Sequence, residues 1–108
     1  MKDDAIEFDY EELEAAEHWH GGQSSMLYAI SSTGSLSRGT IRPRNDDGEP
    51  MTDKEWMADL ASRLDTEASL CAREAIAQAK KARGKEREEL LADADALQSI
   101  AAKAAKRS

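Results

Sequence analysis

The stretch MTDKEWMADLASRLDTEASLCAREAIAQAKKA, residues 51–82, decides the fold of this chain. Thr52 followed by Glu55 forms a capping box, in which each side chain bonds a free backbone N–H group of the first helical turn. Apolar residues then recur at spacings of three and four, which places them on one stripe of a helix. The stripe comprises Met57, Leu60, Ala61, Leu64, Ala68, Cys71, Ala72, Ala75, Ala79 and Ala82. The pattern predicts one long amphipathic helix from Thr52 to Ala82.

A second helix is predicted from Lys85 to about Lys106, after a break at Gly84. Glycine takes the left-handed conformation that often follows a helix, so Gly84 is expected at the C′ position. The apolar side of the second helix is mostly alanine: Leu90, Leu91, Ala94, Leu97, Ile100, Ala101 and Ala104. Two such helices bury little area, so the N-terminal half, a second copy or another protein must cover them. The pair can form a hairpin or one kinked rod, and we predict the hairpin.

Two shorter helices are predicted in the N-terminal half. Asp9 and Glu12 form a second capping box, so a helix follows directly, and Gly21-Gly22 ends it. The next helix spans residues 23–32 with a serine as its N-cap, and residues 35–39 form a turn or one further helical turn. The apolar residues expected to pack these helices on the C-terminal pair are Leu13, Trp19, Met26, Leu27 and Ile30.

The remaining segments are predicted to be irregular. Residues 1–8 are mostly polar and acidic, which is typical of a flexible end, although Ile6 and Phe8 can pair as a short extended segment. Residues 40–50 are interpreted as an extended, arginine-bearing linker, because they contain two prolines and the turn sequence NDDG. The sequence therefore predicts a single all-α domain over residues 1–108, with two short N-terminal helices packed on a long C-terminal helical hairpin.

The net charge of −7 is unevenly distributed along the chain. Residues 1–17 hold eight acids and one base, and residues 18–45 hold three arginines and no acid. Residues 46–70 hold eight acids and two bases, and residues 71–108 hold six acids and nine bases. Such asymmetry concerns partners and solubility rather than fold. The single cysteine, Cys71, cannot form an internal disulfide, and no stretch reads as a membrane span or secretory signal, so a cytoplasmic protein is expected.

Two groups of charged side chains are candidate partner-binding residues. The acidic group lies on one side of the first helix, at spacings of about one turn: Glu11, Glu14 and Glu17, the acidic ridge, with His18 beside it. The basic group lies in the acid-free segment: Arg38, Arg42 and Arg44. Most charge runs are a solvated face, but carboxylates on a rigid helix can also imitate a phosphate backbone or dock on a basic groove. The arginines can contact phosphates, or pair with the acidic ridge or with the acids of residues 45–49.

Enzyme, metal and cofactor motifs are not found. His18 and His20 point about 200° apart on a helix, so they cannot chelate one metal from it. The serines lack the glycine-flanked elbow that exposes a catalytic nucleophile. We therefore expect no catalysis and no cofactor. A helix–turn–helix over residues 23–40 can be imagined, but three arginines in an acidic protein would bind phosphates weakly, which disfavours direct nucleic-acid contact there.

Residues 18–44, HWHGGQSSMLYAISSTGSLSRGTIRPR, and residues 47–56, DGEPMTDKEW, resemble small accessory proteins of proteobacterial phages and integrative or conjugative elements. In size, acidity and helical content the chain is also similar to several anti-CRISPR proteins of such elements. The resemblance implies a bacterial host cytoplasm and a role in blocking host proteins by surface contact. It carries over no binding residue.

Three functions are considered on this basis. The leading hypothesis is a non-enzymatic interaction module that inhibits a host nucleic-acid-handling defence complex of the anti-CRISPR type. Its partner would be a host protein or ribonucleoprotein complex, contacted through the acidic ridge. The second hypothesis is a structural or regulatory homodimer that uses the alanine-rich hairpin as its seam. The third is a DNA-binding regulator that uses residues 23–44.

Overall fold

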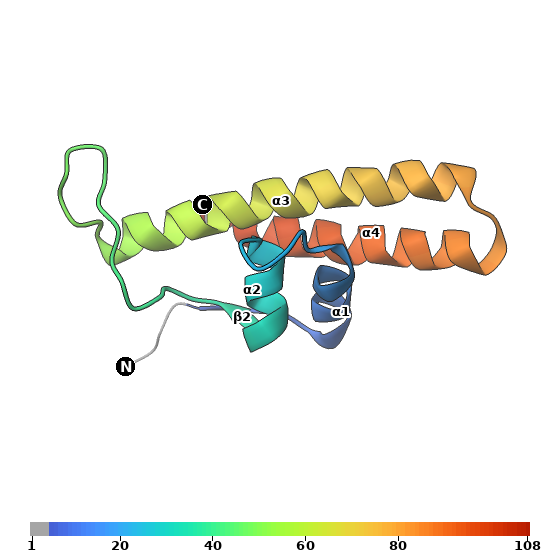
Figure 1. Ribbon diagram of the computed structural model, residues 1–108, viewed down its shortest axis with the longest axis horizontal. Coiled ribbons are helices and arrows are strands. Elements are labelled where there is room, and N and C mark those ends of the chain that lie inside the picture. Colours follow the sequence, from blue (N-terminus) through green and yellow to red (C-terminus); the bar gives the residue numbers. More distant parts are fainter. Residues whose placement is uncertain (1–4) are drawn as a thin grey trace.

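The computed structural model describes residues 5–108, and its four helices confirm the predicted all-α fold (Figure 1). The C-terminal half is an antiparallel hairpin of α3 (Asp53–Lys81) and α4 (Gly84–Ala105). Two short helices, α1 (Tyr10–Trp19) and α2 (Met26–Thr33), lie together against one side of this hairpin. The pair α3 and α4 therefore forms a hairpin rather than a kinked rod.

The long helix α3 is unbroken over 29 residues and lies within one residue of the prediction at each end. Its capping box forms as expected: the Glu55 N–H donates to Thr52 Oγ1 (3.1 Å), and the Thr52 N–H donates to Glu55 Oε1 (2.8 Å). Most of the predicted apolar stripe is buried: Met57, Ala61, Leu64, Ala68, Ala72, Ala75 and Ala79. Much of this stripe packs against α4 of the same chain. The alanine-rich surface suggested as a homodimer interface is therefore an interface between two helices of one protomer.

The turn between the long helices differs from the prediction in one detail. Gly84 has the expected left-handed conformation, with φ +61°, but it is the first residue of α4 rather than the C′ residue of α3. Ala82 caps α3, and both Ala82 and Arg83 are extended. The chain reverses over these two extended residues and the left-handed glycine, so α4 begins one residue earlier than predicted.

The apolar side of α4 is buried in the C-terminal half of the helix: Ala94, Leu97, Ile100, Ala101 and Ala104. Leu91 was predicted to belong to this side, but it is 41% exposed. Adjacent residues of a helix point about 100° apart, so Leu90 and Leu91 cannot both face α3.

A small antiparallel sheet joins the two N-terminal helices. Its strands are β1 (Ile6–Glu7) and β2 (Ser35–Leu36), with Ile6 opposite Leu36. The prediction of a turn or helical turn for residues 35–39 was therefore wrong. Gly34, with φ +89°, ends α2 and redirects the chain so that residue 35 meets β1 instead of continuing a helix.

The first described residues are ordered by this pairing. Ile6 and Phe8 are buried in the core, which contradicts the expected flexibility over this part of residues 1–8 and agrees with the extended segment considered for them. Residues 1–4, to which the same expectation applied, lie outside the described part of the chain.

The core lies where α1, α2 and the sheet meet the hairpin. Its largest fully buried side chains come from α2, α3 and α4: Leu27, Ile30, Leu64, Leu97 and Ile100. The other predicted packing residues, Leu13, Trp19 and Met26, are partly buried around this cluster. Among residues 5–108, no helix is both long enough and apolar enough to cross a membrane.

Candidate functional site

The first helix is fixed on the hairpin by a buried carboxylate. Glu12 is 2% exposed, and its Oε1 accepts hydrogen bonds from the Asp9 N–H (2.9 Å) and from Lys103 Nζ (2.7 Å). Its Oε2 accepts a hydrogen bond from the Ser99 hydroxyl. The Lys103 ammonium also lies 5.4 Å from the centroid of the Phe8 ring. This network joins α1 to α4 and thereby fixes which side of α1 faces solvent.

The acidic ridge occupies the solvent-facing side of α1, as the sequence predicts. Glu11, Glu14 and Glu17 are all exposed, and so is His18. Beside the ridge, between α1 and α2, lies an open hollow of about 550 Å³. Its walls are formed by the following residues: Tyr10, Leu13, Glu14, Glu17, His18 and Ser31.

A second hollow of about 350 Å³ lies between α1 and α4. Glu14 and His18 line both hollows, and α4 adds Glu89 and Asp93 to the second. The two hollows therefore present four carboxylates around one imidazole. Such a surface favours cationic side chains of a partner.

The C-terminal end of α1 is held by Asp93. Its Oδ2 accepts a hydrogen bond from Trp19 Nε1 (3.0 Å) and lies 3.5 Å from His18 Nδ1. A protonated His18 would complete an ion pair there. Glu12 and Asp93 thus anchor the two halves of α1, and Glu14 and Glu17 of the ridge lie between these anchors.

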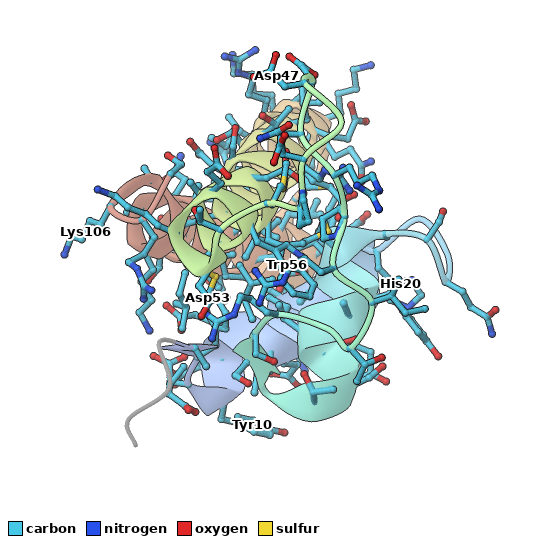
Figure 2. The ribbon with its side chains drawn as sticks, turned by 90° about the vertical axis from the view of Figure 1, so that its left-hand side faces the viewer. Tyr10, His20, Asp47, Asp53, Trp56 and Lys106 are labelled. Atoms are coloured by element: carbon cyan, nitrogen blue, oxygen red, sulfur yellow. The ribbon has the colours of Figure 1, made fainter. Side chains whose placement is uncertain are left out.

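The second histidine has a separate, structural role. The Gly22 N–H donates to His20 Nδ1 (3.2 Å), and the imidazole packs edge-on against Tyr28, with ring centroids 5.1 Å apart. Figure 2 shows His20 on the outer side of the molecule, away from the N-terminal end of α3. Within residues 5–108, no group of three or more His, Cys, Asp or Glu side chains is arranged to hold a metal ion.

Two of the three candidate arginines meet at the N-terminal end of α3 and not at the acidic ridge. Arg42 donates to Asp53 Oδ1 (2.6 Å) and to the Met51 carbonyl (2.6 Å), and its guanidinium lies 5.1 Å from the Trp56 ring centroid. Arg38 Nη2 lies 3.6 Å from Asp53 Oδ2. Figure 2 shows Asp53 and Trp56 beside each other at this end of the helix.

This arrangement corrects the pairing that the sequence suggested, with the acidic ridge or with the acids of residues 45–49. Asp53 opens α3, so its carboxylate is favoured by the helix dipole and is already placed beside the returning loop. Arg44 does not join the pair. It donates to the Gly48 carbonyl (2.6 Å) within its own loop.

Residues 40–50 form a folded loop and not an extended linker. Asn45 Oδ1 accepts from the N–H groups of Asp47 (2.9 Å) and Glu49 (3.1 Å), and a backbone bridge joins Arg44 to Pro50. Asp47 lies at the tip of this loop (Figure 2). No second helix follows α2 before α3, so the helix–turn–helix imagined over residues 23–40 is not formed.

The pKa of Asp53 is held below its usual 3.8, first by the hydrogen bond from Arg42 and then by the charge of Arg38. A depressed pKa means that these contacts stabilise the fold above pH 3.8 and that the contribution is lost as the pH falls through the lowered pKa. We expect Asp53→Asn to lower the thermal midpoint slightly at neutral pH and to leave it unchanged at a pH below that pKa. Thermal unfolding followed by circular dichroism at both pH values tests this, with the exposed Asp47→Asn as control. An equal loss at acid pH would contradict the ion-pair explanation.

A third long-range carboxylate, which the sequence did not predict, orders α2. Glu67 of α3 accepts hydrogen bonds at Oε1 from the Ser25 hydroxyl (2.5 Å) and from the Leu27 N–H (2.7 Å). One turn further along α3, Cys71 Sγ lies 3.6 Å from the Trp19 carbonyl. Burial, reinforced by nearby Glu67 and Glu74, raises the pKa of the Cys71 thiol, so this cysteine is a poor nucleophile.

One sequence pattern indicates the two anchors of α1, Glu12 and Asp93. Asp93 precedes Leu97 by four residues and Ile100 by seven, so it lies on the apolar stripe of α4. Glu12 has the same relation to Ala16 and Trp19. A carboxylate on an apolar stripe must find a partner when it is buried. Glu89, which lines the second hollow, carries no such signal.

Comparisons with known proteins found no match, neither among models of protein families nor among curated proteins or solved structures.

Proposed function

We propose that this protein is a non-enzymatic interaction module that docks on a basic surface of its partner through the acidic ridge and the adjoining hollow. The observation that carries the proposal is that Glu14 and Glu17 line an open hollow of about 550 Å³ together with Tyr10, which is 75% exposed. An arginine entering it would meet carboxylates for paired hydrogen bonds and an aromatic ring for stacking.

The rigidity of α1 supports this role. Because Glu12 is bonded to Ser99 and Lys103, and Asp93 is bonded to Trp19, the ridge is held in place before any partner arrives. A preordered surface loses less entropy on binding than a flexible one. Its negative charge also attracts a basic partner at a distance, which raises the association rate.

The partner that we propose is a host protein or ribonucleoprotein complex that handles nucleic acid, and the consequence of docking is its inhibition in the bacterial cytoplasm. Such complexes bind phosphate backbones in positively charged grooves. Carboxylates spaced along one helix can occupy a groove of this kind in place of phosphates. The resemblance of residues 18–56 to accessory proteins of mobile elements favours a defence complex of the type that anti-CRISPR proteins block.

Charge reversal of the ridge tests the proposal. In the triple variant Glu11→Lys, Glu14→Lys, Glu17→Lys, we expect binding to weaken by about 100-fold or more, because opposing like charges cost several kcal/mol. The measurements are target cleavage by purified CRISPR effector complexes with and without the protein, and retention of those complexes on the immobilised protein.

The matched control reverses three exposed acids elsewhere: Asp47→Lys, Glu49→Lys, Glu74→Lys. It changes the net charge equally and should leave inhibition intact, and circular dichroism should show equal helicity in both variants. Full inhibition by the ridge variant would contradict the proposal that the charges of the ridge bind the partner. Equal losses in both variants would assign the effect to net charge rather than to α1.

A further inference from the structure

The turn between α3 and α4 concentrates positive charge. Residues 80–87, KKARGKER, hold five bases and one acid. The bases, here named the basic tip, are Lys80, Lys81, Arg83, Lys85 and Arg87. All five are exposed, and within residues 5–108 none of them forms an ion pair. Folding therefore leaves this charge available to a partner.

The basic tip is separated from the acidic ridge. The structure is 52 Å long, and Figure 1 shows the turn at one end of the hairpin, beyond α1 and α2. The hydrogen bond of Trp19 holds α1 to α4 at Asp93, six residues after Arg87 or about 9 Å along the helix. That distance is similar to the Debye length of about 8 Å at physiological salt, so salt screens part of the charge of the ridge from the nearest base of the tip, and more of it from the others.

The local charges at the turn also favour a positive sign. Glu86 lies within the tip, and Glu88 and Glu89 follow it in the next turn of α4. Residues 80–89 therefore hold five bases and three acids. The C-terminal end of α3 and the N-terminal end of α4 meet here, and their dipoles carry opposite partial charges that offset each other. The side chains of the basic tip therefore set the sign of the potential.

We propose that the basic tip binds the phosphate backbone of nucleic acid, without reading base sequence. Residues 77–89 contain no aromatic residue and no aliphatic residue larger than alanine. An amphipathic helix that lies in a membrane surface inserts Trp, Phe or Leu side chains, and a protein interface is anchored by aromatic residues. A site with cationic side chains and no apolar anchor fits an array of phosphates best.

This site is independent of the acidic ridge and of the arginines that the sequence first suggested. Arg42 and Arg44 are engaged with Asp53 and with the Gly48 carbonyl, whereas the basic tip makes no such contacts. The net charge of −7 makes the affinity modest and strongly dependent on salt.

Titration of the intact protein into a fluorescein-labelled DNA duplex tests the proposal, with anisotropy measured between about 50 and 200 mM salt. Five phosphate contacts predict a slope of log K against log salt concentration of about −4.5. The double variant Lys80→Gln, Lys81→Gln should weaken binding and make the slope shallower by about 2. Both positions are exposed, and glutamine keeps helix propensity, so the fold is retained.

The control Lys54→Gln, Lys106→Gln removes the same charge at the opposite end of the hairpin, where both residues line one hollow. It should leave the slope unchanged. The charge-reversed ridge variant should keep its DNA binding. The proposal for the acidic ridge and the proposal for the basic tip can therefore fail independently of each other. Equal losses in both lysine variants, no affinity at the lowest salt, or binding only to phosphatidylserine vesicles would each overturn the proposal.

Discussion

Replacing Leu64 with alanine is expected to lower the free energy of unfolding by about 2–5 kcal/mol, because the change leaves a cavity among fully buried side chains of the core. Leu64 is 0% exposed and packs in the cluster that joins α3 to α2 and α4. Few side chains of this size are fully buried, and small domains are stabilised by only about 5–15 kcal/mol in total. Urea unfolding followed by circular dichroism measures the loss.

The matched control is Leu70→Ala. Leu70 lies six residues along the same helix, but it is 58% exposed, so the same truncation should change the free energy by no more than about 0.5 kcal/mol. Similar losses at the two positions would mean that the burial of Leu64 does not determine the stability of α3, because alanine is the better helix former and cannot lower it through helix propensity.

The second large effect is expected at Glu12, where alanine should cost about 3 kcal/mol. The substitution removes a carboxylate that accepts hydrogen bonds from the Asp9 N–H, the Ser99 hydroxyl and the Lys103 ammonium. It leaves the Ser99 hydroxyl without its carboxylate and breaks the capping box of α1. The Lys103 side chain is 37% exposed, so water replaces part of what it loses.

Glu11→Ala is the control for this prediction, since it truncates the same side chain one residue earlier in the same helical turn. Glu11 is exposed, and its loss should change the free energy of unfolding by less than about 0.5 kcal/mol. Urea unfolding of both variants gives the comparison. A small effect at Glu12 would show that the buried network adds nothing beyond an ordinary helix cap.

The features that the sequence predicts well are those determined within one or two helical turns. Both capping boxes form, and the spacing of alanines and leucines in α3 correctly marks its buried side. The exposed positions of Glu14 and Glu17 follow from the same periodicity. These features depend on local hydrogen bonds and on the pitch of a helix, which the residues themselves set.

The features that were missed depend on contacts between distant segments. Glu67 caps α2 across 40 residues, and Arg42 reaches Asp53 only because the loop of residues 40–50 folds back. The strand at Ser35 exists because β1 lies beside it, and two-residue strands have too little pattern to be recognised. Which partner a charged side chain finds is decided by packing, so the sequence could place the acidic ridge but not the hollows around it.

The bond network of Glu12 also has a consequence for synthesis. Ser99 follows Glu12 by 87 residues, so the ribosome needs about 4–17 s to make the partner after it has made the carboxylate. During that interval α1 lacks the groups that bury its carboxylate, and the N-terminal helices cannot complete their docking. Translation therefore orders the assembly: the C-terminal hairpin must emerge before Glu12 is buried and α1 is fixed in place.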